Sequence, residues 1–190
     1  NNRMYVVNFT DDTVSVIDTA TNAVTGTITV GTGPADIAFD SANNRMYVTN
    51  FADDTVSVID TATNAVTGPL TVGTGPYGIA FDSANNRMYV TNYIDGTVSV
   101  IDTTTNAVTG PLTVGTNPWG IAFDSANNRM YVANNTDGTV SVIDTTTNAV
   151  TGTITVGTNP YGIAFDSANN RMYVANHNDD TVSVIDTATN

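Results

Sequence analysis

Short runs of apolar and β-branched residues alternate with turn residues along the whole chain, and no segment shows the apolar spacing of a helix. In the middle of the chain four such runs follow one another: Gly78–Asp82, Arg87–Asn92, Thr97–Asp102 and Ala107–Val114. Turn formers separate these runs, and the Asp-Gly pair ending at Gly96 is a strong hairpin signal. The pattern predicts four antiparallel strands, named A to D in chain order.

The side-chain pattern also predicts how the strands are placed in their sheet. In strand C, Val98 and Val100 face one side and Ile101 faces the other, so both faces of the sheet are apolar and need a cover. Pro69 and Pro111 lie in strand D, and proline is tolerated only at a sheet edge or a bulge because it cannot donate to the ladder. We therefore expect strand D outermost and strand A innermost.

One unit of 42 residues recurs along the chain with almost no change. The copies begin at Asn-Asn-Arg-Met-Tyr-Val and divide the chain into the repeats 1–42, 43–84, 85–126, 127–168 and 169–190. Four strands in a unit of about 40–50 residues is the pattern of a propeller blade. We expect an all-β fold, a β-propeller of four-stranded antiparallel blades with about five blades present. The first blade lacks strand A and the last lacks strand D, so we expect a single array, 1–190, that is a fragment of a larger propeller.

Tyr-Val-Thr-Asn occurs at Tyr47–Asn50 and Tyr89–Asn92, and close variants of it occupy the same place in the other copies. With the flanking Thr-Val-Ser-Val-Ile-Asp and Pro-Tyr-Gly-Ile-Ala-Phe-Asp segments, the chain resembles the YVTN family of β-propeller repeats over all 190 residues. The resemblance implies blade architecture and an extracellular or cell-surface location, as in archaeal and bacterial surface-layer proteins. It implies no catalytic motif.

The charge balance restricts the classes of partner. Five arginines and 18 aspartates give a formal net charge of −13, and lysine, glutamate and cysteine are absent. Nucleic-acid binding needs a basic footprint, so we expect no nucleic-acid partner. No apolar run approaches the roughly 18 residues that a membrane span requires, so we expect no direct membrane insertion.

Aspartates recur at the turns, where this side chain is favoured because it bonds the local backbone. Asp82 and Arg87 flank the A–B turn and are expected to form an exposed pair contributing about 0–1 kcal/mol, as in the other copies. Adjacent aspartates such as Asp53 and Asp54 provide too few oxygens for a calcium site, and the single histidine, His177, is too little for zinc. We expect no metal and no cofactor.

Differences between the copies concentrate at one end of the predicted blades. Ten of the 42 positions vary, and seven lie in or beside the B–C turn and the D–A loop, which share an end because alternate connections of a meander lie at opposite ends. The candidate binding residues on this face are Phe9, Ala35, Asp36, Phe51, Tyr77, Tyr93, Trp119, Asn135, Tyr161 and His177. Exposed aromatic side chains with varied polar neighbours suit recognition of a protein or glycan. Alternatively, loops drift freely and the aromatic side chains fill gaps between blades.

The sequence favours a non-enzymatic surface or secreted propeller that acts as a scaffold, an adhesion module or a protein–glycan binding module. Catalysis usually needs an asymmetric set of groups in different roles, and near-identical copies offer few unique residues. Two alternatives remain open. One is a fragment of a lactonase-like or quinoprotein-type propeller enzyme, and the other is a designed or recently amplified repeat protein with no evolved ligand.

Overall fold

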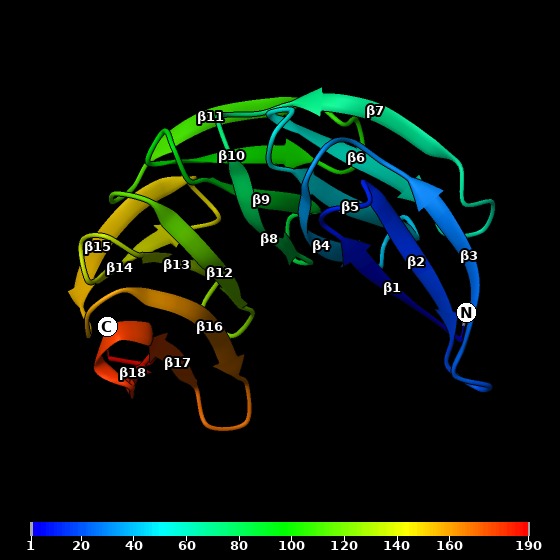
Figure 1. Ribbon diagram of the computed structural model, residues 1–190. Helices are drawn as coiled ribbons and strands as arrows, with labels where there is room; N and C mark the ends of the chain where they lie inside the picture. Colours follow the sequence, from blue (N-terminus) through cyan, green and yellow to red (C-terminus); the bar gives the residue numbers. More distant parts are fainter. Residues whose placement is uncertain (1, 190) are drawn as a thin grey trace.

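The computed structural model describes residues 2–189 as an arc of five antiparallel sheets (Figure 1). The first sheet holds β1 (Arg3–Asn8), β2 (Thr13–Asp18) and β3 (Ala23–Thr29). The second holds β4 (Pro34–Asp40), β5 (Arg45–Asn50), β6 (Thr55–Asp60) and β7 (Val66–Thr71). The third holds β8 (Pro76–Asp82), β9 (Arg87–Asn92), β10 (Thr97–Asp102) and β11 (Val108–Thr113). The fourth holds β12 (Pro118–Asp124), β13 (Arg129–Asn134), β14 (Thr139–Asp144) and β15 (Ala149–Thr155). The fifth holds β16 (Pro160–Asp166), β17 (Arg171–Asn176) and β18 (Thr181–Asp186), with the single 3₁₀ turn η1 (His177–Asp179) before β18.

Strands pair in chain order within every sheet, as a propeller blade requires. The A strands β4, β8, β12 and β16 line the inner side of the arc, and the D strands β3, β7, β11 and β15 form its outer side (Figure 1). The expected all-β propeller architecture is confirmed, including the absence of strand A from the first sheet and of strand D from the last. That the array is a fragment of a larger ring stays a prediction. Within residues 2–189 no helix is long and apolar enough to cross a membrane.

Two strand boundaries differ from the sequence-based expectation. β8 begins at Pro76 instead of Gly78, because Pro76 pairs with Asn92 across an irregularity that shifts the register before Ile79. β11 is shorter than expected at both ends and covers Val108–Thr113. Pro111 lies in this outermost strand, as its missing N–H requires.

The hydrophobic core is divided among the joints between neighbouring sheets. Val98 and Val100 pack with Met130 and Ile143 between the third and fourth sheets. Ile101 points to the other side and joins the cluster between the second and third sheets. Both faces of an internal sheet are therefore covered, as the alternation in strand C predicted. Each internal sheet is therefore stabilised by its two neighbours, as in other repeat arrays.

The expected exposed pair of Asp82 and Arg87 is wrong. The two residues lie opposite each other in the β8–β9 register, but Asp82 is fully buried and its carboxylate accepts from the backbone N of Ala84 at 2.9 Å and from Nδ2 of Asn85 at 2.8 Å. Arg87 reaches the next blade, where its Nη1 donates to the carbonyl of Thr145 at 2.9 Å. The aspartate therefore shapes the A–B turn, and the arginine ties neighbouring blades together.

Candidate functional site

The B–C turns and the D–A loops lie together at one end of the arc, and we call this end the variable face. The backbone N of Phe51, in a B–C turn, donates to the carbonyl of Gly33, in a D–A loop, at 2.9 Å. Tyr93 donates in the same way to Gly75 at 2.9 Å. The shared end expected from meander topology is confirmed, and each loop is fixed to a neighbouring turn.

Each turn and each loop on this face needs one residue with positive φ. In the turn this residue is Asp12 (φ 56°) or, in later copies, Gly96 (φ 65°); in the loop it is Gly33 (φ 64°) or Asn117 (φ 52°). Gly, Asn and Asp reach this region at the lowest cost. Where the turn has aspartate the loop has glycine, and Asp12 Oδ1 accepts from the backbone N of Gly33 at 2.8 Å. Where the turn has glycine the loop has asparagine, and Asn117 Nδ2 donates to the carbonyl of Tyr93 at 3.1 Å.

Three aromatic side chains from successive A strands form one continuous row, the aromatic stack: Tyr77, Trp119 and Tyr161. The ring centroids of Tyr77 and Trp119 lie 4.0 Å apart, and those of Trp119 and Tyr161 lie 4.1 Å apart, with tilted planes in both pairs. All three side chains are half-buried. Trp119 therefore contacts one ring from the preceding A strand and one from the following A strand.

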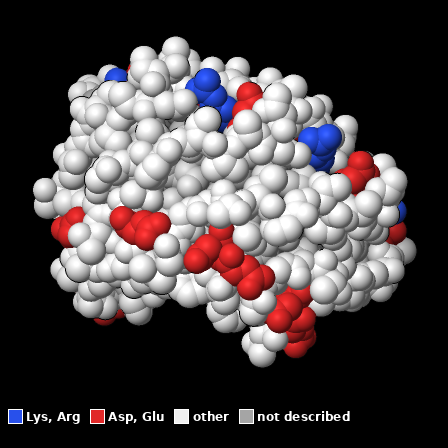
Figure 2. Space-filling view, turned by 90° about the horizontal axis from the view of Figure 1, so that it is seen from above, with Lys and Arg blue, Asp and Glu red and all other residues white. Residues whose placement is uncertain are grey.

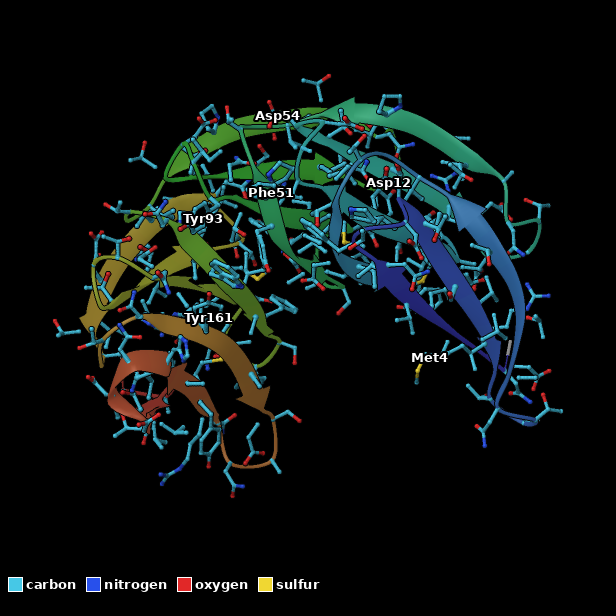
Figure 3. All side chains as sticks on the ribbon, viewed as in Figure 1. Met4, Asp12, Phe51, Asp54, Tyr93 and Tyr161 are labelled. Carbon is cyan, nitrogen blue, oxygen red and sulfur yellow. The ribbon has the colours of Figure 1, made fainter. Side chains whose placement is uncertain are left out.

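Rings from the B–C turns meet the stack edge-on. Phe51 lies 6.1 Å from Tyr77, Tyr93 lies 5.4 Å from Trp119, and His177 lies 5.3 Å from Tyr161, each centroid to centroid and with nearly perpendicular planes. Phe51 follows β5, Tyr93 follows β9 and Tyr161 lies in β16, and Figure 3 labels all three side chains. Six of the ten candidate residues therefore form one aromatic assembly across four sheets.

The remaining candidates are placed differently. Asn135 was expected on the exposed surface, but its side chain is buried, donating from Nδ2 to the carbonyl of Pro160 at 3.4 Å and accepting from Asn159 Nδ2 at 3.0 Å. It ties a turn to a loop because its amide can bond in both directions. Phe9 is 55 % exposed and lies outside the aromatic assembly, since strand A of the following sheet has Ala35 where the other A strands have an aromatic side chain.

Asp36 and the aromatic stack line an open depression of about 340 Å³ on this face. Burial raises the pKa of the Asp36 carboxyl above its ordinary value. Its Oδ1 accepts from the backbone N of Ile37 at 2.8 Å, and its Oδ2 accepts from the backbone N of Ile79 on the next blade at 3.1 Å. The other copies have glycine here, and a Cβ at Gly120 would lie 2.3 Å from the carbonyl oxygen of Tyr161.

Sequence reasoning missed two threonines that hold the stack in place. Thr49 Oγ1 donates to the carbonyl of Tyr77 at 2.7 Å, and Thr91 Oγ1 donates to the carbonyl of Trp119 at 2.9 Å. Both are the threonine of Tyr-Val-Thr-Asn, a position that was noted as variable but not as part of a site. The fourth sheet has Ala133 there, so no hydroxyl supports Tyr161 in this way.

The charges on the variable face are all negative, because the B–C turns contain aspartate and the arginines start the B strands at the opposite end. Figure 2 shows this separation, with arginine near one edge of the surface and aspartate alone along the other. Many of these carboxylates are engaged by backbone donors; Asp53 Oδ2, for example, accepts from the backbone N of Thr32 at 2.6 Å. Across residues 2–189, no group of three or more His, Cys, Asp or Glu side chains could hold a metal ion.

Comparisons with known proteins agree with this architecture. A solved structure of hydrazine synthase from Kuenenia stuttgartiensis is similar over 100 % of this chain and 93 % of that chain, with a TM-score of 0.58 and 15 % identity. At that identity the likeness concerns the fold alone. A search among curated proteins gave no match.

The family profile described as "YNCE-like beta-propeller" matches residues 72–178, which is more than half of the chain. The matched segment includes the whole third and fourth sheets and all three rings of the aromatic stack. The resemblance to YVTN-type repeats is thereby confirmed, and the chain belongs to the YNCE-like β-propeller family.

Proposed function

We propose that this protein is a non-enzymatic propeller module at the cell surface or outside the cell, where it acts as a scaffold or adhesion module that binds protein or glycan through its variable face. The observation that carries the proposal is the aromatic stack. Three stacked rings cross three blades at the end of the arc where the copies differ most.

The hydrogen bonds that fix the loops of the variable face favour a rigid binding surface. Each loop that carries a ring is bonded to neighbouring turns, and Thr49 and Thr91 hold the backbone carbonyls of Tyr77 and Trp119. Preorganised aromatic side chains give a large contact area at a low entropic cost on binding. The shared negative charge favours partners that are neutral or positively charged over polyanions.

The test replaces the stack as a unit, with Tyr77→Ala, Trp119→Ala and Tyr161→Ala in one protein. Binding is measured to immobilised cell-wall polysaccharide, to a glycan array and to intact bacterial cells. If the stack is the centre of the interface, its loss should cost at least about 2 kcal/mol, which weakens binding about 30-fold or more.

A matched control carries three changes away from the variable face: Val24→Thr, Val66→Thr and Val108→Thr, all at exposed valines of D strands. The control should bind as the wild type does. Circular dichroism shows whether each variant keeps its strands. Equal binding by a folded stack variant and the wild type would refute the recognition role and leave the stack as a filler of the gaps between blades.

A further inference from the structure

The two ends of the arc expose opposite halves of the interface that joins neighbouring sheets. At every internal joint, the earlier sheet contributes the tyrosine of strand B and two valines of strand C, and the later sheet contributes methionine and valine of strand B and isoleucine of strand C. The fifth sheet presents the first set at one end of the arc. The first sheet presents the second set at the other end, far from it (Figure 1).

The open face of the fifth sheet, which we call the C-face, is apolar and solvent-exposed. Tyr173, Val182 and Val184 have exposed fractions of 38 %, 60 % and 49 %. The equivalent residues of the fourth sheet are covered by the fifth: Tyr131, Val140 and Val142 have exposed fractions of 0 %, 0 % and 3 %. The C-face is therefore one half of an internal joint, without the sheet that covers it elsewhere in the array.

The open face of the first sheet, the N-face, shows the complementary exposure. Met4 is 56 % exposed and Val6 is 40 % exposed, whereas Met46 and Val48 in the second sheet are 7 % and 0 % exposed. Figure 3 shows Met4 projecting from β1 into the open side of the arc. A hollow of about 480 Å³ beside Met4 is lined partly by Phe39 of β4, where a strand A of the first sheet would lie.

Polar groups are complementary between the two faces as well. Asn85 Nδ2 donates to Thr145 Oγ1 at 3.3 Å at the joint between the third and fourth sheets, and Tyr47 Oη donates to Asn106 Oδ1 at 2.9 Å at the joint between the second and third sheets. The C-face carries the corresponding donors, Asn169 and Tyr173, and the N-face carries the corresponding acceptors, Thr19 and Asn22. Asn22 has φ 57°, and Asn106 has φ 61°, so the acceptor turn already has the conformation found at internal joints.

We infer that the C-face of one molecule packs on the N-face of a second copy of this chain, head to tail. A second copy fits because its N-face has the side chains, the spacing and the turn conformation that cover the equivalent face at four internal joints. The new joint differs from the internal ones in lacking a strand D on one side and a strand A on the other. Such a heterologous contact closes into a ring or extends into a chain, depending on the rotation between copies.

The first experiment measures the mass of the 190-residue chain by light scattering during size-exclusion chromatography, from micromolar to near-millimolar concentration. We expect a mass above the 19.9 kDa of one chain, rising with concentration. Two variants block one face each: Val182→Asp with Val184→Asp on the C-face, and Met4→Asp with Val6→Asp on the N-face. Both pairs are exposed in a single molecule, so the monomer should keep its fold, which circular dichroism verifies.

Each blocked variant alone should run as a monomer. A mixture of the two should form a complex of two chains, because one variant retains an N-face and the other retains a C-face. A control with Val66→Asp and Val108→Asp, at exposed valines outside both faces, should associate like the wild type.

Three results would overturn the inference. The wild type could stay monomeric over the whole range, or association could survive in both blocked variants, which would indicate pairing of sheet edges or another surface. The third is a wild type that associates while the two blocked variants fail to combine. None of these results bears on the binding role of the variable face, which is tested separately by replacing Tyr77, Trp119 and Tyr161.

Discussion

Alanine at Gly120 should destabilise the protein, whereas alanine at Gly162 should not, although the two glycines are equivalent in the repeat. A Cβ at Gly120 would lie 2.3 Å from the carbonyl oxygen of Tyr161 and 3.2 Å from Cγ2 of Ile163. At Gly162 the added atom would meet no described heavy atom within 4 Å, because no strand A follows β16. Neither glycine has positive φ, so backbone strain does not enter the comparison.

The size of the destabilisation by Gly120→Ala follows from which atoms must move to relieve the clash. The clash at Gly120 is with backbone, so β12 and β16 have to separate, and overpacking of this kind costs about 1–3 kcal/mol. Replacing glycine where space is available stabilises by about 0.4–1 kcal/mol, through reduced freedom of the unfolded chain. The two variants should therefore differ by about 1.4–4 kcal/mol in unfolding free energy. For a chain of this size that is a difference of about 3–16 °C in Tm.

Urea and thermal unfolding, followed by circular dichroism, measure the difference at one fixed protein concentration. Trp119 is the single tryptophan and lies in the aromatic stack next to the clash, so its fluorescence reports the local opening of that joint. Gly26→Ala is a control, because a Cβ there also meets no heavy atom within 4 Å. Equal destabilisation by Gly120→Ala and Gly162→Ala would show that close approach of the next strand is not why glycine occupies this position.

Three further changes probe other contacts. Tyr47→Phe removes a buried hydroxyl that bonds the next blade, so it should lower the unfolding free energy in urea by about 0.5–1.5 kcal/mol. Tyr173→Phe on the C-face should leave the unfolding free energy of the monomer unchanged. Equal effects of the two changes would argue against the blade-to-blade bond. Burial raises the pKa of Asp36, so the folded protein takes up this proton before the unfolded chain does, and the contribution of Asp36 to stability falls as pH rises through the folded pKa. The stability of the wild type relative to Asp36→Asn should accordingly be greater at about pH 3 than at neutral pH, and a constant difference would contradict the shift. Asp12→Gly and Gly33→Asn should each lower the unfolding free energy alone and compensate each other together, because both residues take part in the hydrogen bond between turn and loop. A double-mutant cycle should give a coupling energy of at least about 0.5 kcal/mol, and simple additivity would refute this interlock of turn and loop.

Most of the fold could be predicted from the sequence because every strand sits in a repeated context. The bounds of β9 and β10 follow from their β-branched residues and the turns around them. The start of β8 was missed because Pro76 pairs with Asn92 across a register shift, and such a shift depends on tertiary packing. Strand counting showed that the first blade lacks strand A and the last lacks strand D, but it says nothing about which side chains a neighbouring sheet covers, so the apolar end faces were not predicted.

The candidate site was predicted in its location but not in its form. Meander topology places the turns and loops at one end, but the contact between Tyr77 and Trp119 depends on how closely adjacent A strands approach. The glycine at position 78 permits that approach, since a Cβ there would lie 2.4 Å from the carbonyl oxygen of Trp119. Asn135 was assigned to the exposed face because it lies in a B–C turn, and its burial depends on Asn159, a partner from a separate loop.

Hydrogen bonds and packing contacts explain why the residue differs between copies at some of the variable positions, but not at all of them. Aspartate or glycine in the turn, as at Asp12, changes together with glycine or asparagine in the loop, because the two residues share one interlock. Threonine or alanine after Tyr-Val decides whether a hydroxyl supports the stack, and the position of Asp36 is limited by the distance to the next strand. At the positions of Phe9 and Thr10 the polar residues are also bonded within the protein, since Asn135 accepts from Asn159 Nδ2 and Thr136 Oγ1 donates to Asn117 Oδ1. No hydrogen bond of this kind accounts for the choice of ring at the positions of Phe9 and Ala35. These two positions carry the rings of the aromatic assembly, so the variation that internal hydrogen bonds leave unexplained falls on the surface proposed to bind.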